Sequence, residues 1–123
     1  MSYKVLIADD DELIREIVVK ILQREDIYLL EEAINGIDAC LKLGTYKPDL
    51  LILDIMMPEM DGVEVCRTIT RNDEFKNLKV LITTGHPEHA KVAELEALGF
   101  GNGMGKPFNL KNFSSEVYRI LTA

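Results

Sequence analysis

The side chains best suited to chemistry lie where apolar runs of this sequence end. Residues 5–8 lead into four consecutive acidic residues beginning at Asp9, residues 49–55 carry Asp54, and residues 79–84 end in two threonines. Carboxylates gathered in one place repel each other, which raises the pKa of at least one of them and leaves the group in need of a cation. If the apolar runs are parallel strands, their carboxyl ends meet at one edge of a sheet, and we expect these side chains to lie together.

Such a group of side chains is suited to phosphoryl transfer. Oxygen ligands without His or Cys favour Mg²⁺ over Zn²⁺, and Mg²⁺ usually takes one or two protein carboxylates while it keeps waters and phosphate oxygens. An aspartate such as Asp54 can itself be the nucleophile that forms an aspartyl phosphate. Thr84 offers a hydroxyl donor, and Lys106, which precedes Pro107, can bring a positive charge to phosphate oxygens.

The spacing of apolar residues predicts the strands and helices that must hold these side chains. Apolar runs alternate with amphipathic stretches about every 25 residues, which is typical of repeated βα units around a parallel sheet. Strands are predicted at residues 5–8, 27–32, 49–55, 79–84 and 100–105. Helices are predicted at residues 12–24, from 35–36 to 47–48, and at 62–71, 89–98 and 110–121. The last strand has the weakest signal, because glycines at 101, 103 and 105 lower its strand propensity.

The first predicted helix has the clearest amphipathic pattern. Its apolar residues recur at helical spacing: Leu13, Ile14, Ile17, Val18, Ile21 and Leu22. We expect all of them to lie on one buried face. Together the elements predict an α/β domain of (βα)5 architecture around a five-stranded parallel sheet.

Composition and charge exclude several classes of protein. The chain has 123 residues, the size of one domain, and its 47% hydrophobic and 28% charged residues are typical of a folded soluble domain. Its net charge of −7 argues against direct binding of nucleic acid. It has no apolar run of about 20 residues and no basic and then apolar leader, so we expect a cytoplasmic protein without membrane segments. Cys40 and Cys66 form no CxxC pair, which predicts reduced, partly buried thiols.

Four features in a fixed order give the sequence a specific resemblance. An acidic pair at 9–10 follows the first predicted strand, and Asp54 lies in the segment LLILDIMMPEMDG. Thr84 follows Asp54 by 30 residues, and Lys106, which begins the segment KPF, follows it by 52. With these features the chain resembles, as one domain over residues 1–123, the receiver domain of two-component response regulators of the chemotaxis-regulator kind. The resemblance implies a flavodoxin-like three-layer sandwich, with two helices on one face of the sheet and three on the other.

The resemblance also implies a phosphorylation-controlled switch rather than an enzyme with its own substrate. Asp54 would accept a phosphoryl group from a histidine kinase or phosphotransfer protein, and Thr84 and Lys106 would bind the phosphoryl oxygens. Phosphorylation would then change the surface formed by the fourth helix, fifth strand and fifth helix. The output partner would be another protein, or an effector domain outside this chain.

A Mg²⁺ site is part of the same implication. Its ligands would be Asp9, Asp10, Asp54 and the backbone carbonyl of Met56, with Asp10 and Asp54 as the more direct carboxylate ligands. The peptide bond between Lys106 and the following proline would be cis, which proline permits at modest cost.

Gly103 departs from the family pattern. Three residues before the lysine, the family commonly carries a Tyr or Phe whose rotation accompanies phosphorylation, and this chain has no side chain there. Phe100 lies three positions earlier and is not expected to replace it. Thr84, the other residue that takes part in this change in the family, is present. Because glycine costs more entropy to order than other residues, our hypothesis is that residues 99–105 are mobile and become ordered on phosphorylation.

Several nearby polar residues are expected to have structural roles. Asp11 suits the first turn of a helix, and Asp61 suits a turn with the glycine that follows it. His86 and His89 form an HxxH pair without a third ligand and are expected to be surface residues. Thr83 alternates with Thr84 along a strand, so packing is its expected role.

A phosphatase of the haloacid dehalogenase type is an alternative. Its nucleophile is an aspartate after a first strand, with a second aspartate two positions later, and Asp9 and Asp11 have this spacing. Leu13 stands where that motif expects Thr or Val, and 123 residues leave little room for the rest of such an enzyme. The two possibilities differ in whether Asp9 or Asp54 carries the phosphoryl group.

A receiver-like module that only binds other proteins is a second alternative. Such a module would usually lack the acceptor aspartate, the acidic pair or the lysine. This sequence keeps all of them.

Overall fold

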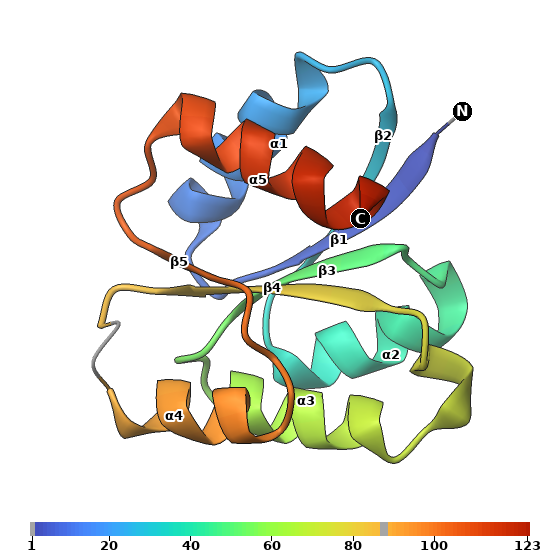
Figure 1. Cartoon of the computed structure of the whole chain (residues 1–123), viewed down its shortest axis with the longest axis vertical. Coiled ribbons are helices and arrows are strands. Elements are labelled where there is room, and N and C mark those ends of the chain that lie inside the picture. Colours follow the sequence, from blue (N-terminus) through green and yellow to red (C-terminus); the bar gives the residue numbers. More distant parts are fainter. Residues whose placement is uncertain (1, 87–88) are drawn as a thin grey trace.

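The computed structural model describes residues 2–86 and 89–123 and shows five strands that alternate with helices (Figure 1). The strands are β1 (Tyr3–Ala8), β2 (Tyr28–Ala33), β3 (Leu50–Asp54), β4 (Lys79–Thr84) and β5 (Gly103–Gly105). The helices are α1 (Glu12–Gln23), α2 (Gly36–Tyr46), α3 (Gly62–Thr70), α4 (Ala90–Ala97) and α5 (Leu110–Thr122), with a short 3-10 turn, η1 (Asp73–Phe75), before β4. Across the described part of the chain, every helix is too short or too polar to span a bilayer.

The predicted parallel sheet is confirmed, with strand order β2-β1-β3-β4-β5. Helices α1 and α5 cover one face, and α2, α3 and α4 cover the other (Figure 1). Alternate residues of the central strand β3 therefore enter different cores: Ile52 packs with α1 and α5, whereas Leu51 and Leu53 pack with α2 and α3. This burial on both faces explains why the strand reads as a continuous apolar run rather than an alternating one.

The expectation of a fully buried apolar face on α1 was wrong at Leu13, whose side chain is 62% exposed. Val18, Ile21 and Leu22 are buried, as expected. Leu13 lies in the first turn of α1, which begins near the carboxyl end of β1, and the two residues before it, Asp11 and Glu12, are exposed as well. Apolar spacing predicts the side of a helix that faces the core, but not how far along the helix the core reaches.

The fifth strand is shorter than predicted, because it begins at Gly103 rather than at residue 100. Phe100 instead completes the end of α4: its N–H donates to the carbonyl of Leu95 at 2.9 Å, and its ring packs against the core beside α4. Gly99 makes this turn with a φ of 98°, which strongly favours glycine. The glycines at 101 and 103 then leave little side-chain surface for pairing.

Cys40 is partly buried and Cys66 is buried, and both are free thiols, as predicted. Burial raises the pKa of the Cys66 thiol to about 12. At neutral pH this sulfur is therefore an unreactive part of the core.

We predict opposite effects for alanine at two glycines of α2. A Cβ at Gly36 would lie 1.9 Å from the Met60 carbonyl oxygen, so Gly36→Ala forces the backbone apart and should lower the free energy of unfolding by about 1–3 kcal/mol. A Cβ at Gly44 meets nothing within 4 Å, and Gly44→Ala should raise it by about 0.5–1 kcal/mol. Urea denaturation of both variants checks the pair. If both substitutions changed the free energy of unfolding equally, the contact with Met60 would not determine the effect of Gly36→Ala.

Candidate functional site

The parallel register brings the predicted reactive side chains to one edge of the sheet. Asp9 directly follows β1, Asp54 is the last residue of β3, and Thr84 is the last residue of β4. Ala8 pairs with Leu53 across β1 and β3, so Asp9 and Asp54 are neighbours by register. These two aspartates and Thr84 are buried although polar, which requires partners for their charges and hydrogen bonds.

Asp9 is held on both of its carboxylate oxygens. Oδ1 accepts a hydrogen bond from the N–H of Asp11 at 2.9 Å, and Oδ2 accepts one from Nζ of Lys106 at 2.8 Å. The Asp9 backbone carbonyl accepts a further hydrogen bond from the Arg15 guanidinium at 2.7 Å. Asp9 is therefore a fixed side chain, held in place by protein groups.

Lys106 links the two buried aspartates. Its Nζ lies 2.8 Å from Oδ2 of Asp9 and 3.3 Å from Oδ1 of Asp54. Its backbone N–H donates to the carbonyl of Thr84 at 2.8 Å, and the peptide bond to Pro107 is cis, as the resemblance implied. The lysine thus reaches from the end of β5 across the carboxyl edge of the sheet to the ends of β1 and β3.

The crowded carboxylates change the acidity of the site. Burial and the negative charge of Asp9 raise the pKa of Asp54 to about 6, and the Lys106 ammonium only partly opposes them. Burial lowers the pKa of Lys106, but its hydrogen bond to Asp9 and the charges of Asp54 and Asp9 outweigh burial, and the pKa is raised overall. Near neutral pH the site therefore holds an ionised Asp54 and a fully charged lysine.

The acidic residues form a group that suits a hard cation. Carboxylate oxygens of Asp9, Asp10 and Asp54 lie within 4.8 Å of one another, and Asp10 is exposed to solvent. One ammonium group does not neutralise the carboxylates, and the negative charges of Asp9 and Asp10 add to the effect of burial in raising the pKa of Asp54. A donor set made only of carboxylate oxygens fits Mg²⁺.

The loop after β3 carries Met56, the remaining predicted metal ligand. The chain folds back so that the N–H of Gly62 donates to the carbonyl of Ile55 at 2.8 Å. A Cβ at Gly62 would lie 2.8 Å from the Asp54 carbonyl oxygen, so this close return requires glycine. The Met56 side chain is 47% exposed and ends in a soft thioether, which is a poor ligand for Mg²⁺, so the backbone carbonyl oxygen is the group that Met56 would offer.

Thr84 and Gly103 lie beside the acidic group rather than in it. The Thr84 hydroxyl oxygen accepts a hydrogen bond from the N–H of His86 at 2.9 Å, so its own hydrogen can be donated to a ligand. A Cβ at Gly85 would meet nothing within 4 Å, so the chain leaves space next to Thr84. Gly103 pairs with Ile82, further back along the strand, and does not reach the carboxylates.

The residues expected to be structural act as helix caps or pack in the core. The Asp11 side chain caps α1, and His89 Nδ1 accepts a hydrogen bond from the N–H of Lys91 at the start of α4. Asp61 forms a capping box at the start of α3. Thr83 is buried, as its place in the strand predicted.

Sequence reasoning missed two contacts around the site. Arg15 holds the Asp9 carbonyl and also forms a salt bridge with Glu32 at 3.1 Å. Lys91 forms a salt bridge with Asp61, which connects α4 to the start of α3. Both pairs join residues distant along the chain, and no local pattern marks which charged side chains will meet.

Comparison with known proteins gives consistent relatives. The family model described as the response regulator receiver domain matches residues 5–118. The alkaline phosphatase synthesis transcriptional regulatory protein PhoP of Bacillus subtilis is 36% identical over 121 residues, which cover 98% of this chain and 49% of that protein. The sporulation initiation phosphotransferase F of the same organism is 32% identical over 121 residues, covering 98% of this chain and 95% of that protein.

Solved structures agree with the sequence relatives. The chemotaxis protein CheY4 of Vibrio cholerae superposes with a TM-score of 0.89 at 30% sequence identity, covering 98% of this chain and 99% of that one. The chain spans about half the length of PhoP and of the mycobacterial response regulator MprA, with 49% and 51% of those proteins covered.

Proposed function

The chain belongs to the response regulator receiver domain family, and from this premise we propose that Asp54 is its phosphoacceptor. The donor in this proposal is a histidine kinase or phosphotransfer protein, and residues 1–123 act as one receiver domain. The observation that carries the proposal is the placement of Lys106, within 2.8 Å of Asp9 and 3.3 Å of Asp54, at an edge that also holds a group of carboxylates. A carboxylate beside a fixed cation is suited to receive a charged phosphoryl group.

The reaction begins with the ionised Asp54 carboxylate. One of its oxygens bonds to phosphorus, the bond between phosphorus and the donor nitrogen breaks, and the electron pair leaves with the donor imidazole. The raised pKa of about 6 leaves Asp54 mostly ionised at neutral pH. Lys106 places its ammonium near the transferring oxygens, and Thr84 donates its hydroxyl hydrogen to one of them.

Asp9, Asp10, Asp54 and the Met56 carbonyl would hold Mg²⁺, which would supply positive charge next to the phosphoryl oxygens. Both Asp9 oxygens accept hydrogen bonds from protein groups. Asp10 is exposed and is the carboxylate most easily turned toward an ion.

Asp54 is better placed than Asp9 to be the nucleophile. Both Asp9 oxygens are engaged by Asp11 and Lys106, whereas Asp54 is contacted on one oxygen at 3.3 Å. The Asp11 carboxylate accepts hydrogen bonds from N–H groups of the first turn of α1, so it is occupied as a helix cap. These contacts argue against the haloacid dehalogenase alternative.

The proposed role is that of a cytoplasmic switch that promotes only its own phosphorylation and the hydrolysis of its own phosphoryl group. A phosphoryl group on Asp54 adds negative charge beside Lys106 and Thr84, both of which connect to β4 and β5. The resulting change would shift the population of α4, β5 and α5 and alter affinity for an output protein or an effector domain.

Intact mass spectrometry tests the proposal. After incubation with Mg²⁺ and acetyl phosphate, we expect a gain of one phosphoryl group, which disappears when EDTA replaces Mg²⁺ and in the Asp54→Asn variant. Phosphoramidate provides a second small donor. A gain that survives in Asp54→Asn would identify another acceptor, such as Asp9. No gain with either donor would favour a module that only binds proteins.

A further inference from the structure

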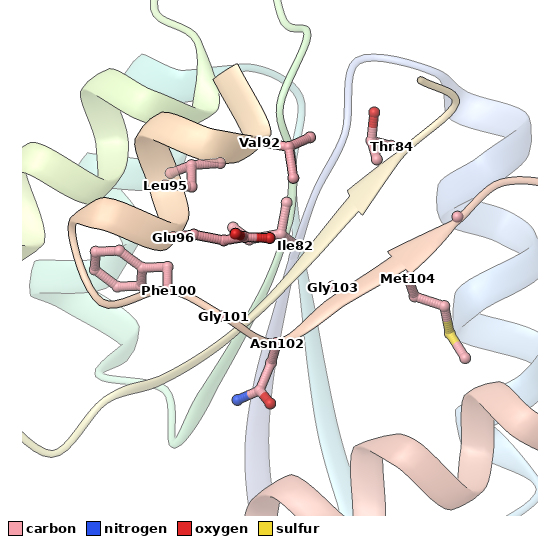
Figure 2. Close-up of a pocket in the computed structure, with 11 residues that line it drawn as sticks. Ile82, Thr84, Val92, Leu95, Glu96, Phe100, Gly101, Asn102, Gly103 and Met104 are labelled. Carbon is pink, nitrogen blue, oxygen red and sulfur yellow. The ribbon is translucent and has the colours of Figure 1, made fainter. Parts of the chain in front are cut away.

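A pocket of about 260 Å³ opens between α4 and β5, and none of Asp9, Asp10 and Asp54 lines it. Figure 2 shows Val92 and Leu95 on α4, Ile82 on β4 and Phe100 after α4 arranged around this space. We call it the α4–β5 pocket. Its walls are mainly apolar side chains, while the backbone of residues 101–105 forms one side.

The pocket exists because β5 has no side chain on the face toward α4. Met104 points to the other face and packs with the core of α1 and α5, so Gly103 faces α4 (Figure 2). A Cβ at Gly103 would meet only the Ile82 carbonyl oxygen, at 3.8 Å, and a Cβ at Gly101 would meet nothing within 4 Å. Neither glycine has a positive φ, so the backbone would accept side chains there.

The size and lining of the pocket suit an aromatic ring. An apolar cavity of about 150 Å³ admits benzene, and this pocket is larger and open to solvent. A ring could pack against Ile82, Val92 and Leu95 and lie close to the bare backbone at Gly103. Offset packing with the Phe100 ring would add to this contact.

Glu96 places a negatively charged side chain at the α4–β5 pocket. Figure 2 shows its side chain reaching from α4 toward β4 and β5, and it lines the pocket. Lys91 and Glu94, on the same helix, are already paired with Asp61 and Arg67. Among the described residues, no salt bridge engages Glu96. Its carboxylate is therefore available to a cation brought by a partner.

From these features we propose that the α4–β5 pocket binds an aromatic side chain of a partner protein that carries a Lys or Arg next to that aromatic residue. The ring fills the space left by Gly103, and the basic side chain pairs with Glu96. Thr84 lines the same pocket, so binding there and phosphorylation of Asp54 would influence each other. This linkage rests on the proposed phosphoacceptor function, whereas the binding itself does not.

Short capped peptides test the binding on unphosphorylated protein labelled with ¹⁵N. We expect a peptide with the central sequence Lys-Phe to bind with a dissociation constant on the order of millimolar and to shift the amide signals of Leu95, Gly101 and Gly103. Replacing its Phe with Ala should abolish these shifts. Replacing its Lys with Glu should weaken binding about three- to fivefold, as expected for an exposed ion pair.

Substitutions in the pocket provide the matched controls. Gly103→Phe should fill the space from within and weaken the Lys-Phe peptide at least about tenfold, whereas Gly44→Ala, on α2, should leave its affinity unchanged. Circular dichroism checks that the variants are folded. Glu96→Gln, at an exposed position, should remove the preference for Lys over Glu in the peptide and tests the proposal independently.

Three results would overturn the inference: equal binding of the Ala peptide, shifts confined to other elements, or binding unaffected by both pocket variants. If the peptides fail while Asp54 still gains a phosphoryl group from acetyl phosphate, this inference fails alone. If Asp54 gains none while the peptides bind as expected, the pocket remains and the phosphoacceptor proposal fails.

Discussion

Replacing Lys106 with methionine is expected to slow phosphorylation of Asp54 by about two to three orders of magnitude. Among the described residues, Lys106 alone forms salt bridges with both Asp9 and Asp54. Methionine keeps much of the length and volume of lysine but removes the charge. The loss would fall on the transfer step, because the ammonium group opposes charge on the phosphoryl oxygens as the bond to the donor breaks.

The rate of mass gain with acetyl phosphate and Mg²⁺ measures this effect. Lys111→Met is the matched control, because Lys111 is exposed on α5 and should leave the rate unchanged. Lys106→Arg keeps the charge in a bulkier group and should recover only part of the rate, since a planar guanidinium does not reproduce a compact ammonium. If Lys106→Met were phosphorylated as fast as the wild type, the lysine would have only a structural role.

The sheet and its reactive edge could be predicted because both depend on local patterns. The continuous apolar run of β3 marks a strand buried on both faces, and a parallel sheet places Asp54 beside the end of β1. The resemblance to the receiver family then gave a functional meaning to the distances of Thr84 and Lys106 from Asp54 along the sequence. Each of these features is visible within a short stretch of sequence or at a fixed distance along it.

Features that depend on three-dimensional packing could not be predicted in the same way. Leu13 has the correct spacing for burial but lies beyond the edge of the core. Arg15 reaches the Asp9 carbonyl because α1 starts close to β1, and nothing in its neighbours in sequence indicates this contact. The absence of a side chain at Gly103 was evident, but the pocket it leaves depends on the position of α4.

The Asp54→Asn variant, compared with the wild type in EDTA, is expected to show how much an ionised Asp54 destabilises the fold. An ordinary aspartate has a pKa of 3.8, whereas the pKa of Asp54 in the folded protein is about 6, so the folded state binds a proton more tightly than the unfolded chain. As pH rises from about 4 to about 7, the folded state loses this proton later than the unfolded chain, and stability falls. Over this pH range the free energy of unfolding falls by about 2–3 kcal/mol.

Urea denaturation in EDTA at both ends of this range measures the effect. Asn has nearly the same shape and does not ionise. We therefore compare, at each pH, the free energy of unfolding of Asp54→Asn with that of the wild type. The advantage of the variant should be about 2–3 kcal/mol larger near pH 7 than near pH 4. Other groups titrate in both proteins and largely cancel in the comparison. Mg²⁺ should then stabilise the wild type more than the variant near pH 7, because its ligands include the ionised carboxylate. A difference between the two proteins that does not change with pH would mean that Asp54 is not held in a site that disfavours its charge.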